Sequence, residues 1–357
     1  MKVAFVSNYY NHHQESFSNT MINLTDGQYW FIATEKMDEE RIKLGWGDEK
    51  CFPFIIPAYK NNNYLNMAKK IIDNADVVIY GLNGWKNFQL IGNRLKKNKL
   101  TFQYTERIYK QEICWYKLPI QALKLWLVGG RYSSMYLLCA SAYTSYDYAR
   151  TRCYLEKAYK WGYFPEFRKY DIEELMQKKV SSGKSEVGEK IVSILWAGRL
   201  IGWKHPEAPI KLADSLKKKG YHFRMSIIGT GEMQQQLYDM ISEADLKDCV
   251  EILGSMTPNE VRSYMEKADI YLFTSDFNEG WGAVLNESMN SGCAVVASHA
   301  IGSVPFLINS GENGLVYRNG DQEHFEQQVK KLLDDPSYRK MLGKKAYHTI
   351  CTMWNAE

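Results

Sequence analysis

The chain has 357 residues, more than one hydrophobic core usually serves, so two domains are expected. Hydrophobic residues make up 45% and charged residues 24%, which is typical of globular proteins and excludes a largely disordered chain. The sequence contains no run of about 18 apolar residues and no signal-peptide pattern at its start, so neither a membrane-spanning helix nor a leader is expected.

The seven cysteines are an odd number and form no CxxC pair. This pattern argues against a disulfide framework and against a zinc site. We therefore expect a reducing, cytoplasmic location and no metal site.

Charge is distributed unevenly along the chain, although the net charge is only +4. Residues 1–165 carry a net +8, the remainder carries a net −4, and 69–131 alone hold 12 basic and 4 acidic residues. A basic half suggests an anionic partner, such as a lipid surface, a phosphorylated acceptor or nucleic acid. No DNA- or RNA-binding module is recognisable, so nucleic acid is not expected.

Short apolar runs alternate with helical patterns through residues 1–165. This rhythm predicts an α/β domain with a parallel, doubly wound sheet. The expected strands are Val3–Ser7, Asp76–Tyr80, Leu100–Tyr104 and Leu137–Ala140, and the expected helices are Tyr64–Asn74 and Gln89–Lys97.

The polar segment 166–190, with Ser-Ser-Gly-Lys-Ser near its middle, is typical of a linker. A second α/β series begins at residue 191, so each half is expected to form its own Rossmann-like sheet. Its expected strands are Ile191–Ala197, His222–Ile228, Val250–Leu253, Asp269–Thr274 and Ala294–Ser298. Its expected helices are Pro206–Lys219, Glu232–Glu243, Pro258–Lys267 and Ala283–Ser291.

The strongest functional pattern is Glu279-Gly-Trp-Gly-Ala-Val-Leu-Asn-Glu287, between an expected strand and an expected helix. Glycines let the backbone approach a ligand closely, and a helix start favours phosphate. The two carboxylates can accept hydrogen bonds from paired hydroxyls at different ends of one ligand. The alternative is an ordinary helix start with a surface glutamate, which the neighbouring motifs make the weaker interpretation.

Two further motifs follow expected strands of the same half. In Gly198-Arg-Leu-Ile-Gly-Trp-Lys204, Arg199 can hold a phosphate in a fork and Lys204 adds a point charge. In Gly229-Thr-Gly231-Glu232, a turn could face a phosphate or a sugar, although the third glycine of a dinucleotide fingerprint is absent. Alone, each could be an ordinary surface loop.

Taken in chain order, the loop Gly198–Lys204, the turn Gly229–Glu232 and the segment Glu279–Glu287 resemble the retaining glycosyltransferases of family 4. These enzymes have the GT-B fold, in which two Rossmann-like domains face each other across a cleft. The segments SGCAVVAS, Gly302-Ser-Val-Pro305 and Gly311-Glu-Asn-Gly314 are also similar. The resemblance covers roughly residues 191–320. It implies an N-terminal acceptor domain over 1–165, a donor domain over 191–340 and a last helix, 341–357, that crosses back to the first domain.

The resemblance also implies roles for individual residues. Arg199 and Lys204 would bind and stabilise the donor diphosphate, Glu279 would contact the sugar hydroxyls, and Glu287 would hold the ribose. No metal or other cofactor is implied, and the sequence has no Asp-x-Asp. The donor would be a UDP- or GDP-linked sugar, and the remaining expected contacts are Gly198, Gly229, Gly231, Glu232, Ser255, Gly280, Trp281, Gly282, Ala283 and Val284.

The first half departs from the family pattern because no glycine-rich loop follows Val3–Ser7. Asn8 and His13 stand there instead, and His13 could touch a ligand or simply pack in its loop. Relatives often carry a histidine near residue 105, where this chain has Glu106 and Arg107. We expect these four residues to contact the acceptor or to line the cleft.

The segment Ile113–Val128 mixes tryptophan, tyrosine and lysine with apolar residues. It could lie on an anionic membrane surface, as a peripheral protein would. An ordinary buried helix interrupted by Pro119 is the slightly favoured interpretation.

The sequence therefore predicts transfer of a sugar to a hydroxyl of a glycan or lipid-linked acceptor, in assembly of a surface polysaccharide on the inner face of a membrane. The alternatives are another GT-B enzyme, such as a sugar-nucleotide epimerase, or a catalytically silent partner subunit.

Overall fold

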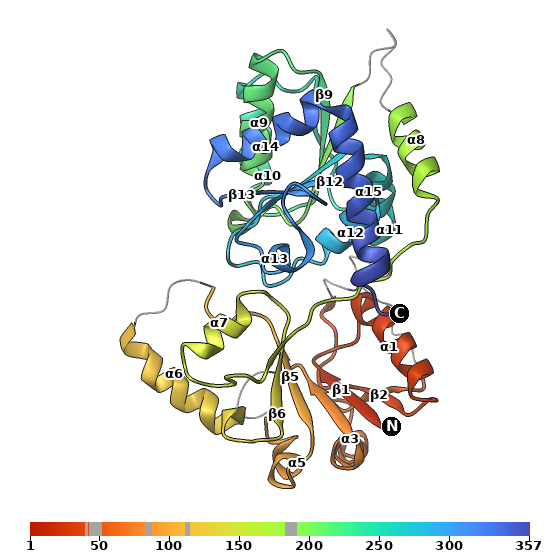
Figure 1. The fold of residues 1–357 in the computed structure, drawn as a ribbon, viewed down its shortest axis with the longest axis vertical. Helices are drawn as coiled ribbons and strands as arrows, with labels where there is room; N and C mark the ends of the chain where they lie inside the picture. Colours follow the sequence, from red (N-terminus) through yellow and green to blue (C-terminus); the bar gives the residue numbers. More distant parts are fainter. Residues whose placement is uncertain (40–41, 43–51, 83–87, 111–114, 183–190) are drawn as a thin grey trace. The chain divides into compact units, whose positions relative to one another are not determined.

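The computed structural model describes residues 1–39, 42, 52–82, 88–110, 115–182 and 191–357. The chain forms two compact units (Figure 1). The N-terminal unit comprises Met1–Glu166 with Ala356–Glu357, and the C-terminal unit comprises Phe167–Asn355. Each unit is built on its own parallel sheet.

The sheet of the N-terminal unit has the strand order β3-β2-β1-β4-β5-β6-β7, and all the strands pair in parallel. Val3 of β1 lies opposite Tyr29 on one side and Val77 on the other, so the strand order reverses at β1. The strands are β1 Val3–Ser7, β2 Tyr29–Ala33, β3 Ile55–Pro57, β4 Val77–Tyr80, β5 Thr101–Thr105, β6 Met135–Cys139 and β7 Ala158–Lys160.

Helices cover both faces of this sheet because each connection between parallel strands must cross over it. One face packs Phe5 and Phe31 against Phe17 of the first helix, and the other buries Ile72 and Leu95. The helices are α1 His12–Leu24, α3 Asn62–Asn74, α5 Gly92–Lys96, α6 Leu118–Leu125 and α7 Thr144–Ala149, with a 3₁₀ turn η1 Trp115–Lys117 and a π turn η2 Trp126–Gly130.

The C-terminal sheet is also entirely parallel, in the order β10-β9-β8-β11-β12-β13. Its strands are β8 Val192–Ala197, β9 Phe223–Ile228, β10 Val250–Ile252, β11 Ile270–Phe273, β12 Ala294–Ser298 and β13 Leu315–Tyr317. The strands read as nearly continuous apolar runs because both faces are covered.

In this unit α9, α10 and α14 lie on one side of the sheet, and α11, α12 and α15 lie on the other (Figure 1). The helices are α8 Ile172–Ser182, α9 Glu207–Lys218, α10 Gln234–Glu243, α11 Pro258–Lys267, α12 Val284–Asn290, α13 Val304–Leu307, α14 Gln322–Asp334 and α15 Pro336–Met353, with a 3₁₀ turn η3 Gly202–Lys204.

The expected fold class is confirmed, since each unit is an α/β layer structure with one parallel sheet. The strand expected at Ala294–Ser298 and the helix expected at Pro258–Lys267 have those bounds in the structure. Of the strands that the sequence analysis did not predict, β3, β7 and β13 have only three residues each. Strands this short give little period-2 pattern, although β10, which is equally short, was expected, and β2, with five residues, was not.

The segment 166–190, expected to be a linker, contains helix α8. Asp171 Oδ1 accepts hydrogen bonds from the backbone N–H groups of Glu173 and Glu174 and so begins the helix. The ammonium of Lys179 is buried and donates to the carbonyls of Met265 and Ala268, at 2.8 and 2.6 Å. Burial lowers the pKa of Lys179. Residues 183–190 lie outside the described residues.

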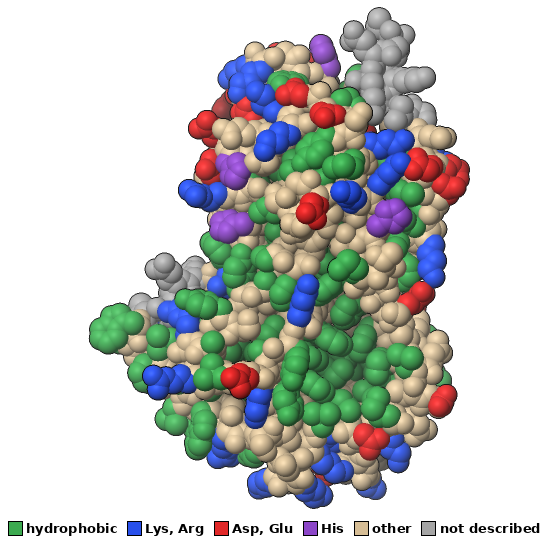
Figure 2. Space-filling model, viewed as in Figure 1, with side chains coloured by type: hydrophobic (Ala, Val, Ile, Leu, Met, Phe, Trp, Pro, Cys, Tyr) green, Lys and Arg blue, Asp and Glu red, His purple; other side chains and the backbone are tan. Residues whose placement is uncertain are grey.

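The segment around Pro119 differs from the favoured sequence interpretation of a buried, interrupted helix. Pro119 stands in the first turn of α6, where its missing N–H costs no hydrogen bond, so it starts the helix. No side chain of α6 is fully buried. Hydrophobic (green) and basic (blue) side chains gather over α6 at the lower left of Figure 2. Residues 113 and 114 of the predicted segment lie outside the described residues.

Candidate donor and acceptor sites

The predicted donor motifs lie at the point where the strand order of the C-terminal sheet reverses. β8 and β11 are neighbours there and are not consecutive in the chain, so the loops after them diverge to opposite sides. Ligands of open parallel sheets bind at the carboxyl ends of the strands at such a point. Gly198-Arg199…Lys204 follows β8, and Glu279 lies in the loop after β11.

Backbone hydrogen bonds fix the loop after β8 against its neighbours. Gly198 N donates to Ile228 O at 2.9 Å, and Leu200 N donates to Thr230 O at 2.9 Å. Directly after β11, the side-chain hydroxyl of Thr274 donates to Lys204 O at 2.7 Å. A side chain on Gly229 would bring its Cβ within 1.8 Å of the Gly198 carbonyl oxygen. The glycine is therefore required for the two loops to touch.

Lys204 and Glu279 meet directly. The Lys204 Nζ atom lies 2.5 Å from Glu279 Oε2, and both side chains are largely buried. The Ser275 hydroxyl donates to the same carboxylate oxygen at 2.9 Å. A charge pair in this partly desolvated setting is stronger than one on the surface. The loops after β8 and β11 thus hold a cation and an anion side by side.

Arg199 lies exposed in the same loop as Lys204. Trp203 stands between the two residues in the sequence, and both cations lie near its ring. Lys204 Nζ is 4.7 Å and Arg199 Cζ is 5.8 Å from the ring centroid. Cations are attracted to the face of an aromatic ring, so Trp203 steadies both side chains. No sequence pattern indicates a role for Trp203, although the residue stands inside the motif Gly198–Lys204.

His205 ends the loop with a left-handed backbone, φ +49°. Its Nδ1 lies 3.0 Å from Glu207 Oε1, and its Nε2 lies 3.5 Å from Asp276 Oδ2. The hydrogen bond with Glu207 and the charge of Asp276 raise the pKa of His205 above its ordinary value. The imidazole therefore clamps the loop after β8 to the loop after β11. Nothing in the sequence pattern signals this contact.

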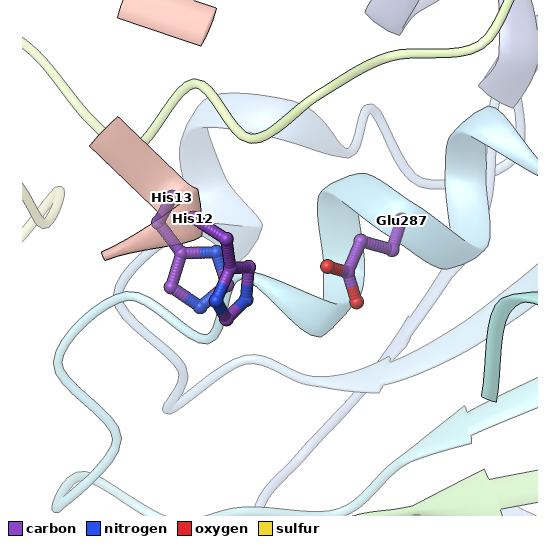
Figure 3. Close-up of side chains that lie close together, drawn as sticks. All are labelled: His12, His13 and Glu287. Carbon is purple, nitrogen blue, oxygen red and sulfur yellow. The ribbon is translucent and has the colours of Figure 1, made fainter. Parts of the chain in front are cut away.

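Glu287 lies in the first turn of α12 and is half-buried (Figure 3). Gly282, before the helix, has φ +82°, and a Cβ there would lie 2.4 Å from Phe273 Cζ and 3.2 Å from Glu279 Cγ.

Behind the site, the hydroxyl of Tyr271 donates to Ala197 O. Burial, reinforced by the charge of Glu287, raises the pKa of Tyr271 well above its ordinary value, so the hydroxyl keeps its proton.

Trp281, an expected donor contact, has its side chain directed into the core. Its side chain is fully buried, donates from Nε1 to Asn286 Oδ1 at 2.9 Å and stacks on Trp354. The indole thus belongs to the core and orients the loop. Of the other expected contacts, Gly231 packs against Leu200 and Gly280 is buried, whereas Ala283 and Val284 are half-buried and Glu232 and Ser255 are exposed.

In the N-terminal unit, Asn8 and His13 follow β1. The carbonyl of Asn8 accepts hydrogen bonds from the N–H groups of Thr34 and Glu35, which ties the end of β1 to the end of β2. The imidazoles of His12 and His13 lie together at the start of α1, with ring centroids 3.9 Å apart (Figure 3).

Glu106 and Arg107 follow β5 and point to different partners. Glu106 Oε1 accepts from the hydroxyl of Tyr163 at 2.7 Å, and the Tyr163 ring is parallel to that of His13, with centroids 6.4 Å apart. Arg107 instead pairs with Asp147, at 3.5 Å. The structure therefore brings His13 and Glu106 together through Tyr163, a residue that no sequence motif identified.

A separate cavity of about 440 Å³ lies at the carboxyl ends of β2 and β3. Its walls include Tyr10, Phe52, Tyr59 and Tyr64, and none of the predicted site residues lines it.

Residues 177–349 match the family model described as glycosyl transferases group 1. This stretch contains Arg199, Lys204, Glu279 and Glu287. The similarity of this stretch to the group 1 glycosyl transferases confirms the resemblance to glycosyltransferases that the motifs predicted.

Two curated relatives carry names that specify sugar transfer. The amylovoran biosynthesis glycosyltransferase AmsK of Erwinia amylovora is 34% identical over 135 residues, which cover 36% of this chain and 33% of that protein. An N-acetylgalactosamine-N,N'-diacetylbacillosaminyl-diphospho-undecaprenol 4-alpha-N-acetylgalactosaminyltransferase of Campylobacter jejuni is 30% identical over 176 residues, which cover 49% of this chain and 46% of that protein. The chain thus spans a third to a half of these relatives.

Among solved structures, HepE of Anabaena in complex with UDP has a TM-score of 0.69 at 14% identity, with 100% of this chain and 96% of that chain covered. WaaG, a glycosyltransferase involved in lipopolysaccharide biosynthesis, has a TM-score of 0.62 at 16% identity, with 98% and 95% covered. These similarities establish a GT-B fold.

Proposed function

We propose that the protein is a glycosyltransferase that moves a sugar from a nucleotide-sugar donor to a hydroxyl of a glycan or lipid-linked acceptor. The observation that carries this proposal is the Lys204–Glu279 pair. It lies at the switch point of the C-terminal sheet, beside Arg199 and within the family-matched segment.

Each donor-side residue has a role that its chemistry supports. Lys204 and Arg199 are cations that would hold the donor diphosphate, and Glu279 is a fixed acceptor for sugar hydroxyls. Glu287, in the first turn of α12, would accept hydrogen bonds from the ribose hydroxyls. Two cations can neutralise a departing diphosphate, which is the task of a metal ion in other transferases. We therefore propose a metal-independent reaction.

We further propose that the reaction retains the anomeric configuration, as in family 4. The bond between the anomeric carbon and the phosphate oxygen breaks as Lys204 and Arg199 stabilise the leaving charge. The acceptor oxygen then bonds to the same carbon on the same face, and its proton passes to the departing phosphate oxygen. The nucleoside diphosphate leaves with the electron pair of the broken bond.

For the donor, a UDP- or GDP-linked sugar fits the proposal, and the UDP complex of the Anabaena neighbour favours UDP for the first trial. For the acceptor, the names of the bacterial relatives favour a surface polysaccharide or a lipid-linked glycan. His13, Tyr163 and Glu106 are the residues of the N-terminal unit that we propose for the acceptor side. We propose that the protein acts at the cytoplasmic face of a membrane, to which it is attached peripherally.

A nucleotide panel tests the donor proposal. UDP, GDP, ADP and their sugar conjugates are added in EDTA, and the melting temperature is measured. A ligand at 100 times its dissociation constant should add about 2.7 kcal/mol of stability. Lys204→Ala should lose most of this shift and lower turnover at least about 100-fold, the scale of losing one group that stabilises charge in the transition state.

Lys211→Ala is the matched control, since Lys211 is an exposed lysine of α9. It should keep both the shift and the turnover. Unchanged turnover in Lys204→Ala, or a folded wild-type protein that no nucleotide stabilises, would contradict the proposal.

A further inference from the structure

An unusual concentration of exposed apolar side chains marks the segment from η1 to η2. Among the described residues, sixteen large hydrophobic side chains are exposed, and five of them fall within twelve consecutive positions. Between 48% and 80% of each is exposed to solvent. Single exposed apolar residues are normal, but a cluster of this kind indicates a contact surface. The five are Trp115, Tyr116, Ile120, Leu123 and Trp126.

The spacing of these residues gives α6 and the start of η2, which continues it, one apolar face. Ile120, Leu123 and Trp126 are three residues apart, so they lie along the same side of the helix. On the opposite side, Leu125 and Val128 pack against the core of the N-terminal unit. The helix is therefore anchored through one face and presents the other as a fixed ridge.

Cations flank the apolar ridge, and residues 115–131 contain no acidic residue. Lys117 and Lys124 are seven positions apart, which puts them on one flank of the helix. The guanidinium of Arg131 lies over the Trp126 ring, 5.7 Å from its centroid, and Lys117 Nζ lies 5.9 Å from that of Tyr116. Aromatic rings interleaved with cations match the interface of a bilayer that contains anionic lipids.

Among the described residues, no helix is long and apolar enough to cross a membrane. We propose that η1–α6–η2 is a monotopic docking element. It lies in the headgroup region of an anionic bilayer, with Ile120, Leu123 and Trp126 inserted and Lys117, Lys124 and Arg131 on lipid phosphates. This inference deepens the membrane attachment in the proposed function by assigning the surface that makes it.

Vesicle flotation with the full chain tests the assignment. The probes are vesicles of phosphatidylcholine alone and of phosphatidylcholine with phosphatidylglycerol. Wild-type protein should float with the anionic vesicles, and 0.5 M NaCl should weaken this binding because salt screens charge. Leu123→Glu should lower the partition coefficient at least about tenfold, the effect of losing one buried leucine. Lys117→Gln with Lys124→Gln should lower it about fivefold per charge.

Leu24→Glu is the matched control, because Leu24 is 74% exposed at the end of α1 in the same unit. It should float like wild type. The assignment is overturned if wild type fails to float, or if Leu24→Glu lowers flotation as much as Leu123→Glu. It is also overturned if Leu123→Glu instead dissociates a lipid-free dimer in sedimentation velocity, which would make the face a protein contact.

Nucleotide stabilisation of the same variants separates this inference from the transfer reaction. All of them should keep the wild-type shift, because none alters the loops after β8 and β11. Loss of flotation with an intact nucleotide shift isolates the docking element. Flotation without any nucleotide shift leaves the docking element standing and counts only against the transferase.

Discussion

Glu279 is held by two donors of different kinds, the ammonium of Lys204 and the hydroxyl of Ser275. Both donate to the same oxygen, Oε2. The other carboxylate oxygen is the one that a sugar hydroxyl would meet in the proposed function. The orientation of this acceptor therefore depends on Ser275 as well as on the more conspicuous lysine.

Ser275→Ala is expected to lower kcat/KM at least about tenfold, because a hydrogen bond to a charged group contributes roughly 1.5–3 kcal/mol. The effect should fall on the donor sugar and leave the fold intact. Ser226→Ala is the control, since Ser226 donates to Glu251 at 2.9 Å on the surface of the same sheet. Steady-state kinetics on both variants decide the point. Equal effects would show that loss of any Ser–Glu hydrogen bond suffices.

His205 makes the stability of the donor loop depend on pH. Its pKa is raised in the folded protein, chiefly by the hydrogen bond with Glu207 and also by Asp276. The protonated form therefore favours the folded state. This contribution is complete below the unfolded-state pKa of about 6.5 and is lost as the pH rises through the raised folded-state pKa.

His205→Asn removes the charge and tolerates the left-handed backbone. Compared with this variant, wild type should be more stable at pH 6 and should lose the advantage by pH 9. The difference should stay below about 1 kcal/mol, because the pair is partly exposed to solvent. Thermal melts across this range measure it. If the melting temperatures of wild type and His205→Asn differ by the same amount at every pH, the proposed clamp is refuted.

At the scale of elements, the glycines of the donor loops are fixed by packing as well as by backbone angle. Gly282 and Gly220 have almost the same backbone, φ +82° and +79°, but only Gly282 is crowded by a neighbour, Phe273. Replacing Gly220 by alanine should cost about 1 kcal/mol, from the left-handed backbone alone. Gly282→Ala should cost roughly 1–3 kcal/mol more, because Phe273 and Glu279 must move.

Chemical denaturation gives the two free energies of unfolding, and nucleotide binding gives a second readout. Gly282→Ala should also weaken donor binding, since the displaced Glu279 is the proposed sugar contact. Gly220→Ala should bind nucleotide as wild type does. If both alanine variants lose the same free energy of unfolding, the close approach to Phe273 contributes nothing to the destabilisation.

Elements with long apolar runs were predictable from the sequence, and elements defined by their neighbours were not. Strand β12 lies fully buried between helices, so its sequence is apolar throughout and marks its own ends. Helix α8 carried a signal that the polar composition of 166–190 obscured. Ile172, Leu175, Met176 and Lys179 follow helical spacing after the capping residue Asp171.

The candidate site divides in the same way. Lys204 and Glu279 were identified because each stands within a continuous sequence motif, one in the loop after β8 and the other in the loop after β11. Ser275 and Tyr163 were missed because their roles depend on contacts between segments. The sequence also could not show that the side chain of Trp281 points into the core, because a loop has no regular period that tells which side chains point inward.

At the scale of the whole molecule, each unit has its own hydrophobic core. The C-terminal core surrounds β8 to β13, and the N-terminal unit has a cluster on each face of its sheet. All the proposed donor contacts lie in the C-terminal unit, and the proposed docking element lies in the N-terminal unit. A division of this kind predicts that nucleotide and lipid act on different cooperative units.

Scanning calorimetry of the full chain should therefore resolve two transitions, and a saturating donor nucleotide should raise only one. At 100 times its dissociation constant the ligand adds about 2.7 kcal/mol, which corresponds to a rise of roughly 5–10 °C for a unit of this size. Gly282→Ala assigns the transition, because it should lower the same one that nucleotide raises. A single transition whose calorimetric and van't Hoff enthalpies agree would mean that the two cores unfold as one cooperative unit. Donor binding would then stabilise the element proposed to dock on the membrane as well.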